Sequence, residues 1–135
     1  MQGVIHVPTI LMPASVGELV DKITILEIKA SRILEQNQNK NIVAELKALL
    51  SCYDSNIEGA EKLVDLRAGL KKINETLWDI EDDIRSCERQ SDFGANFVRL
   101  ARSVYIQNDK RAALKREINL LVGSDIIEEK SYSAY

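Results

Sequence analysis

The sequence has few of the residues that interrupt helices or build sheets. Its 135 residues include only two prolines and six glycines, and aromatic residues make up 5%, whereas charged residues make up 29%. A β-sandwich or barrel needs many more turn-forming and β-preferring positions, so an all-β fold is excluded. The 45% apolar content is enough for one ordinary core. We therefore predict a single helical domain over residues 1–135.

Long apolar runs and an excess of basic charge are also missing. No apolar run approaches the roughly 20 residues needed to cross a bilayer, and residues 1–6 lack the basic segment of a secretory signal. The net charge of -3 gives no general attraction to nucleic acid or to anionic lipid. We therefore expect a cytoplasmic protein that neither inserts into a membrane nor binds nucleic acid.

Cysteine and histidine are scarce, and the standard catalytic motifs are absent. Cys52 and Cys87 each lie alone in a helical pattern, so we interpret both as small buried apolar residues. The only histidine is His6, and the sequence has no nucleophile elbow, phosphate-binding loop, dinucleotide fingerprint or zinc-binding helix motif. We therefore predict no bound metal and no cofactor.

The first 34 residues divide into an arm and a helix. Residues 1–14 are apolar and contain Pro8 and Pro13, which predicts an extended arm that adds a short strand or packs across another subunit. Ser15 and Glu18 have the spacing of a capping box, so the first helix is expected to begin there.

Later boundaries are predicted from polar breaks and capping residues. The run Gln36–Asn39 is interpreted as a polar break before a shorter helix of about four turns. A second capping box, Ser55–Glu58, is expected to begin the third helix, and Asp92 is expected to cap the fourth. Gly123 is a typical left-handed helix stop, and it leaves residues 124–135 as an irregular tail.

The apolar periodicity indicates how these helices pack. The first helix carries Ile25 and Ile28 outside its main apolar stripe, so it is expected to be central or to lie at an interface. The third helix has a seam with alternating spacings of three and four, typical of a bundle or a coiled coil. The seam consists of Leu63, Leu66, Leu70, Ile73, Leu77, Ile80, Ile84 and Cys87. We predict an all-α antiparallel bundle of about four long helices within residues 15–123, in which the last two form a hairpin.

Polar residues interrupt the apolar seam of the fourth helix. Asn108, Arg111 and Lys115 fall where Val104 and Ile118 predict core positions. Each such group costs a few kcal/mol when it is buried without a partner, so partners are expected on the neighbouring helices. The candidate partners are Asp21, Lys22, Glu27 and Arg32 on the first helix and Trp78, Glu81, Asp82, Arg85 and Glu88 on the third. This distribution predicts a charged site between helices.

Three interpretations of these charges stay open. By base rate, long helices carry solvated faces with pairs at a spacing of four, such as Glu81 with Arg85. A polar network that fixes the register of the bundle or the pairing of subunits is the second interpretation. The third is a ligand-binding or catalytic site.

Several segments, which together span nearly the whole chain, carry a recognisable pattern. They are Pro13–Lys29, Leu77–Arg85, Asn108–Ala112, Ile118–Asn119, Gly123–Ser124 and Glu128–Tyr132. The pattern resembles a small bacterial domain family of unknown function whose members occur beside glycosyltransferases and surface-polysaccharide genes. The resemblance implies a link to glycan or nucleotide-sugar metabolism without defining a reaction.

The positions that match this pattern are mostly polar and include Glu128. All of them except Glu128, together with Lys115, form the predicted ligand-binding set. They are Asp21, Lys22, Glu27, Trp78, Glu81, Arg85, Asn108, Asp109, Arg111, Lys115, Lys130 and Tyr132. The stretch 36–70 carries none of these motifs and is expected to be scaffold.

Two functional hypotheses follow. The first is a non-catalytic binding or assembly module, a homodimer that docks with glycan-biosynthesis proteins and uses the polar centre for register or for an anionic small molecule. The alternative is a small enzyme, with or without magnesium, that acts on an anionic sugar or nucleotide metabolite. In that case Arg85, Arg111 and Lys115 would hold the anion, and Glu81 or Asp109 would act as general base. Both hypotheses require Asn108 and Arg111 to point inward.

Overall fold

The computed structural model describes residues 3–135, and these residues form four α-helices, one short 3-10 helix and no strand. The elements are α1 (Val16–Arg32), α2 (Gln36–Asn56), η1 (Ala60–Leu63), α3 (Val64–Arg89) and α4 (Ala95–Val122). The prediction of an all-α bundle of four helices is confirmed.

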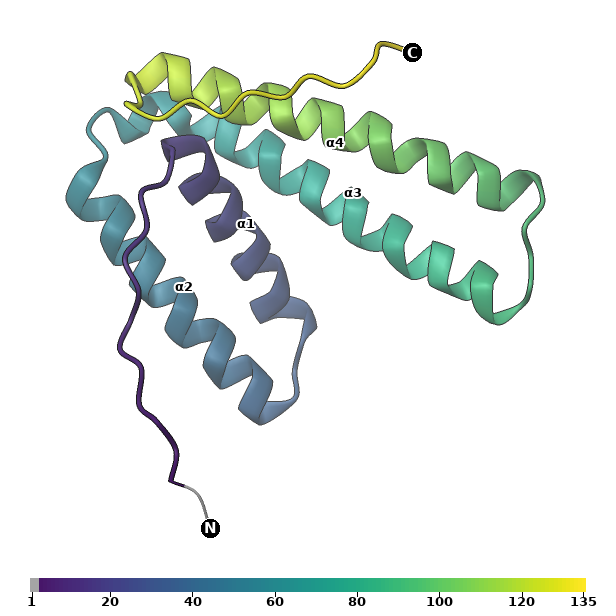
Figure 1. Ribbon diagram of the computed structural model, residues 1–135, viewed down its shortest axis with the longest axis horizontal. Helices are drawn as coiled ribbons and strands as arrows, with labels where there is room; N and C mark the ends of the chain where they lie inside the picture. The colour runs from purple at the N-terminus through teal and green to yellow at the C-terminus, as the bar shows by residue number, and fades with distance from the viewer. Residues whose placement is uncertain (1–2) are drawn as a thin grey trace.

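The helices form two hairpins that meet at one end and diverge toward the other. Figure 1 shows the α1–α2 hairpin and the α3–α4 hairpin joined near η1 and the C-terminal end of α4. Helix α1 packs against all three other helices, whereas α2 packs mainly against α1. The expectation that the first helix is central is therefore confirmed, and Ile28 on its second apolar face is buried.

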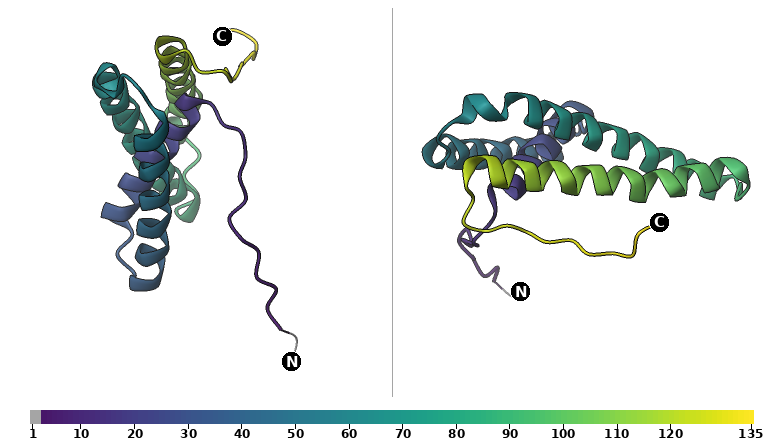
Figure 2. Two further views of the ribbon diagram at one scale, coloured as in Figure 1. Left: turned by 90° about the vertical axis from the view of Figure 1, so that its left-hand side faces the viewer. Right: turned by 90° about the horizontal axis from the view of Figure 1, so that it is seen from above.

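The apolar core is divided between the two ends of the α3–α4 hairpin. The main cluster lies where the hairpins meet, and its buried members are Val20, Ile23, Tyr53, Leu63, Leu70 and Ile118. A smaller cluster joins the distal halves of α3 and α4 through Ile80, Cys87 and Leu100. In Figures 1 and 2 this distal part projects beyond α1 and α2. Polar side chains at the α1–α4 crossing are therefore close to the main core.

Two predicted helix ends are confirmed. Ser15 is the N-cap of α1, and its hydroxyl oxygen accepts from the Glu18 amide at 3.1 Å. The Glu18 carboxylate bonds to Lys115 on α4. Gly123 ends α4 in the left-handed conformation, with φ of 65°.

The predicted start points of the second and third helices are wrong. The polar run from Gln36 is the first turn of α2, because the Glu35 carboxylate caps it by accepting from the amides of Asn37 and Gln38. The segment that begins at Ser55 does not start a helix, because α2 continues through Asn56 and the chain then turns at Gly59.

Two further details also differ from the predictions. Asp92 does not cap α4: Gly94 is the N-cap, and the Asp92 carboxylate accepts from the Gly94 amide within the preceding loop. Cys87 is buried as expected, but Cys52 is exposed. Helix α2 packs mainly against α1, and therefore most of its surface faces solvent.

The arm (residues 3–14) and the tail (residues 124–135) are placed differently relative to the helices. Residues 3–14 form no helix, and this arm stands away from the helices (Figure 2, left). The tail, residues 124–135, turns back and runs alongside α4 (Figures 1 and 2). Within the described part of the chain, no helix has the length and apolar character needed to cross a membrane.

Candidate functional site

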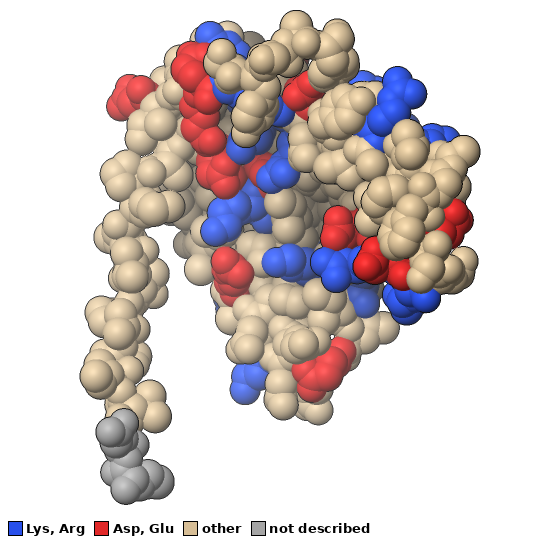
Figure 3. All heavy atoms as spheres, turned by 45° about the vertical axis from the view of Figure 1, so that its right-hand side comes forward, with Lys and Arg blue, Asp and Glu red and all other residues tan. Residues whose placement is uncertain are grey.

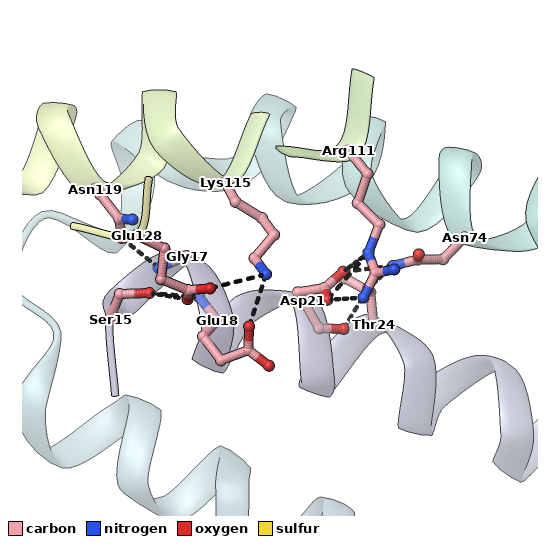
Figure 4. A network of polar contacts seen from close by, with 10 residues as sticks. All are labelled: Ser15, Gly17, Glu18, Asp21, Thr24, Asn74, Arg111, Lys115, Asn119 and Glu128. Carbon is pink, nitrogen blue, oxygen red and sulfur yellow. Dashed lines mark hydrogen bonds and ion pairs between the residues drawn. The ribbon is translucent and has the colours of Figure 1, made fainter. Parts of the chain in front are cut away.

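The start of α1 is fixed to the end of α4 and to the tail. The Gly17 amide donates to the side-chain oxygen of Asn119 at 2.6 Å, and the Ser15 hydroxyl donates to the Glu128 carboxylate at 2.9 Å. Gly17 permits this approach, because a Cβ at this position would lie 2.5 Å from the Lys115 carbonyl oxygen. Figure 4 shows these groups converging from α1, α4 and the tail.

A buried carboxylate lies one turn further along α1. Asp21 is fully buried, and Arg111 on α4 binds it with Nε at 3.0 Å from Oδ1 and Nη2 at 2.5 Å from Oδ2. Asn74 on α3 donates to Asp21 at 2.8 Å and to the Thr24 hydroxyl at 2.9 Å. The hydrogen bonds from Arg111 to Asp21 raise the pKa of the guanidinium, so Arg111 stays protonated. Three helices are thus joined through one carboxylate.

Lys115 forms a second ionic contact one turn along α4 from Arg111. Its ammonium nitrogen lies 2.6 Å from the Glu18 carboxylate and 3.7 Å from that of Glu128 in the tail. The two cations on this face of α4 therefore each lie over carboxylates from α1 or the tail (Figure 4). Acidic and basic side chains also lie next to each other on the face drawn in Figure 3.

The tail is held along α4 by further charged and aromatic contacts. Lys130 lies 2.7 Å from Asp109, and the Tyr135 ring packs edge-on against Tyr105 with centroids 5.1 Å apart. The hydrogen bond from Lys130 and a second from Tyr135 lower the pKa of Asp109. The same contact with Asp109 raises the pKa of the Tyr135 hydroxyl.

We expect the docking of the tail to depend on pH at both extremes. Because the pKa of Asp109 is lowered, this carboxylate stabilises the docked tail fully above its ordinary pKa of 3.8. That stabilisation is lost as the pH falls through the lowered pKa. Because the pKa of Tyr135 is raised, its hydroxyl stabilises the docked tail fully below its ordinary pKa of 10.0. That stabilisation is lost as the pH rises through the raised pKa. Amide NMR shifts of residues 124–135 should therefore stay constant between these limits and change beyond them.

The Asp109→Asn variant is the control for this titration. It removes the carboxylate that titrates at low pH. The amide NMR shifts of residues 124–135 in the variant should therefore not show the change that the native protein shows at low pH. Identical acid titrations for the two proteins would contradict a role for the Asp109 contact in docking the tail.

Two grooves lie between the tail and α4. The Asn119 groove has a volume of about 520 Å³ and is also lined by Arg116 and Glu128. The Asn108 groove has a volume of about 530 Å³ and is also lined by Tyr105 and Arg111. The two grooves share part of their lining, namely Asp109, Ala112, Lys115, Lys130, Tyr132, Ser133 and Tyr135.

Seven of the predicted ligand-binding residues lie together where α4 faces α1 and the tail. They are Asp21, Asn108, Asp109, Arg111, Lys115, Lys130 and Tyr132. Arg111 points inward onto Asp21, as both functional hypotheses require, and Asn108 is half-buried and lines a groove.

The other predicted residues do not join this group. Lys22 is exposed, and its ammonium nitrogen lies 4.0 Å from the Glu45 carboxylate on α2. Glu27 lies 3.6 Å from Arg67, a residue at the start of α3. Both are contacts between helices away from the two grooves.

The remaining three lie on the distal half of α3. Glu81 and Arg85 are exposed and pair with each other at 2.9 Å, which is the arrangement expected of a solvated helix face. Trp78 is half-buried, and the guanidinium carbon of Arg32 lies over its ring, 5.6 Å from the ring centroid. Arg85 is eleven residues along α3 from Asn74, a separation of about 16 Å at 1.5 Å per residue.

The sequence patterns missed part of the site. Asn74 had a detectable signal, because it lies one turn after Leu70 and directly beside the predicted apolar seam, where a polar residue needs a partner. Asn119 lies beside buried Ile118 and is itself buried. Tyr135 had no such signal, since the path of an irregular tail is not encoded in helical periodicity.

The charges around the grooves are balanced, which limits their chemistry. Arg111, Lys115 and Lys130 each form an ion pair with a carboxylate. Over residues 3–135 no group of three or more His, Cys, Asp and Glu side chains is placed to hold a metal ion. The arrangement can therefore offer paired charges, amides, hydroxyls and aromatic rings to a ligand.

The chain matches a protein-family model over most of its length. Residues 11–135 match the model described as a family of unknown function, DUF6165. No curated protein and no solved structure matches the chain. The match covers all four helices and the tail but only the last residues of the arm. The chain therefore belongs to this family of unknown function.

Proposed function

We propose that this protein is a non-catalytic helical binding module whose ligand occupies the Asn108 groove between the tail and α4. The observation that carries the proposal is the groove itself, because its volume of about 530 Å³ lies within the usual range of small-molecule sites. Its lining comes from a rigid helix on one side and an irregular tail on the other, so the tail can adjust around a bound molecule.

The chemistry of the lining favours a hydroxyl-rich, sugar-like ligand. Tyr105, Tyr132 and Tyr135 offer apolar ring faces with polar tips, and Asn108 and Ser133 offer an amide and a hydroxyl. A purely anionic ligand is less well supported, because it would have to displace the carboxylates that already pair with the basic residues. A sugar-like ligand agrees with the link to surface-glycan or nucleotide-sugar metabolism that the family resemblance implies.

The enzyme hypothesis has weaker support. Arg85 and Glu81 pair with each other at the surface of the distal hairpin, away from Arg111 and Lys115. Asp109 has a lowered pKa, and a carboxylate with a lowered pKa is a poorer general base at neutral pH. Arg111, Lys115 and Asp109 line the Asn108 groove, but Arg85 and Glu81 lie outside it, so the full set assigned to anion binding and base catalysis does not meet in one cavity.

Titration with a panel of sugars tests the proposal. We expect monosaccharides, oligosaccharides or nucleotide sugars to shift the amide NMR signals of residues around the Asn108 groove. Tyr132→Ala should weaken the binding of such a ligand by roughly tenfold, which corresponds to the loss of a contact worth about 1.4 kcal/mol. Phe93→Ala, which removes an exposed ring at the far end of the α3–α4 hairpin, is the matched control and should leave affinity unchanged.

The same samples separate binding from catalysis. The proposal expects each ligand to be recovered intact after long incubation with the protein and magnesium. Turnover that is lost in an Asp109→Asn variant would support the enzyme hypothesis. A panel that produces no shifts, or shifts that Tyr132→Ala leaves unchanged, would overturn the assignment of the groove.

We also propose that the module assembles as a homodimer and docks with glycan-biosynthesis proteins. The support for assembly comes from the apolar arm at the start of the chain, which α1 to α4 leave uncovered.

A further inference from the structure

The arm carries a continuous apolar surface that faces solvent. Six large apolar side chains lie within nine residues, and Val4 and Leu11 are 98% and 92% exposed. The six are Val4, Ile5, Val7, Ile10, Leu11 and Met12. Residues 3–14 contain no Asp, Glu, Lys or Arg, and His6 is their only ionisable side chain. An exposed apolar surface of this kind marks a contact site.

The arm is suited to reach another molecule. Pro8 and Pro13 fix their own φ angles and disfavour the α conformation in the residues before them, so the arm cannot fold back as an amphipathic helix. Twelve extended residues span up to about 40 Å. In Figures 2 and 3 the arm projects from the helices and does not lie across them.

An apolar surface of matching character lies beside the root of the arm. Leu120 and Leu121 in the last turn of α4 are 58% and 48% exposed, and Ile126 and Ile127 in the tail are also exposed. We call these four residues the α4-end patch. The Ser124 hydroxyl joins the two regions, because it accepts from the first amide of α1 and donates to the Ile126 carbonyl. The root of the arm and the α4-end patch are therefore next to each other.

We propose that two copies of this chain exchange their arms, so that the arm of each copy packs over the α4-end patch of the other. Because each arm starts beside its own patch and extends away from it, a two-fold axis near this end lets each arm reach the partner's patch and covers both apolar surfaces at once. The exchange supplies a surface for the self-association proposed above, and it is independent of the ligand groove.

The area available is sufficient for a stable dimer. Burial of a side chain of this size removes about 60 to 120 Å² of apolar surface from water. Twelve such side chains from two arms remove about 700 to 1,400 Å², and the receiving patches add to this total, which reaches the 1,200 to 2,000 Å² of stable interfaces. Both surfaces are apolar, so the dimer should persist at high salt.

Sedimentation of the full-length chain tests the exchange. We expect a dimer for the native sequence and a monomer for the arm variant Ile5→Asp/Leu11→Asp, with the dissociation constant raised at least 100-fold. The patch variant Leu120→Lys should also dimerise more weakly than the native chain. Circular dichroism should show native helix content for the arm variant and for the patch variant. Val43→Asp, which changes an exposed apolar residue on α2, is the matched control and should remain a dimer.

Mixing the two weakened variants identifies the geometry. The patch variant keeps an intact arm and the arm variant keeps an intact patch, so a one-to-one mixture should regain a heterodimer with one native contact. A monomeric native chain would overturn both the exchange and the proposed self-association. A dimer that survives the arm variant would overturn the exchange alone. A mixture that stays monomeric would also overturn the exchange, and a patch variant that remains a full dimer would indicate that the arms pair with each other.

Discussion

Replacement of Arg111 by methionine is expected to lower the free energy of unfolding by about 3 to 5 kcal/mol. Asp21 is fully buried, and Arg111 is the cation that binds both of its carboxylate oxygens. Methionine fills a similar volume but leaves the carboxylate with only neutral partners in the interior. Because small proteins unfold with about 5 to 15 kcal/mol, this loss is a large share of the total. Urea denaturation followed by circular dichroism measures it.

Two further variants isolate the cause of that loss. Asp21→Asn combined with Arg111→Met removes both charges and keeps amide and hydroxyl partners around Asn74 and Thr24, so the double variant should be more stable than Arg111→Met alone. Arg116→Met removes an exposed partner of Glu129 from the same helix and should change stability little. Equal losses for Arg111→Met and Arg116→Met would contradict the importance of the buried pair.

A second large effect is expected from Gly17→Ala, which should destabilise the protein by about 1 to 3 kcal/mol. The added Cβ would lie 2.5 Å from the Lys115 carbonyl oxygen and 3.0 Å from the Asn119 side-chain oxygen. Helices α1 and α4 would have to separate, and the hydrogen bond from the Gly17 amide to Asn119 would lengthen. Chemical denaturation gives the size of the change.

Gly69→Ala is the matched control for this substitution. Gly69 is inside α3, and a Cβ there would meet only the Leu114 side chain at an ordinary 3.5 Å. Alanine is favoured over glycine in a helix by about 1 kcal/mol, so Gly69→Ala should stabilise the protein by up to that amount. The same chemical change should thus have opposite signs at the two positions. Stabilisation at Gly17 would show that the two helices approach less closely than we describe.

The fold was predictable where helical periodicity determines it. The two apolar faces of α1 indicated a central helix, and Gly123 marked the end of α4. The boundary errors arose where a local capping signal was outweighed by its surroundings. Ser55 has the spacing of a capping box, but it lies within the last turn of α2, and the chain turns only at Gly59. Glu35 caps α2 although glutamate is not among the preferred N-cap residues.

The candidate site was predictable only in part. Arg111 and Lys115 stood out because they occupy seam positions on α4, and both bind carboxylates of α1. The choice of Asp21 over Glu27 as the partner of Arg111 depends on the crossing angle of two helices, which periodicity does not encode. Glu81 and Arg85 had an equally polar pattern, but the distal hairpin places them in solvent. The role of the tail could not be inferred, because it depends on the direction of the chain after Gly123.

The partners of the polar residues at the start of α1 lie far along the chain, and this separation affects when α1 can pack during synthesis. Ser15, Gly17 and Asp21 find their partners about 90 to 113 residues later in the chain. While the ribosome is still making α2 and α3, the polar face of α1 has no native partner from α4 and its acidic groups stay hydrated. The central helix of this protein therefore reaches its final environment only after α4 and the tail have been translated, and such long-range closure slows folding.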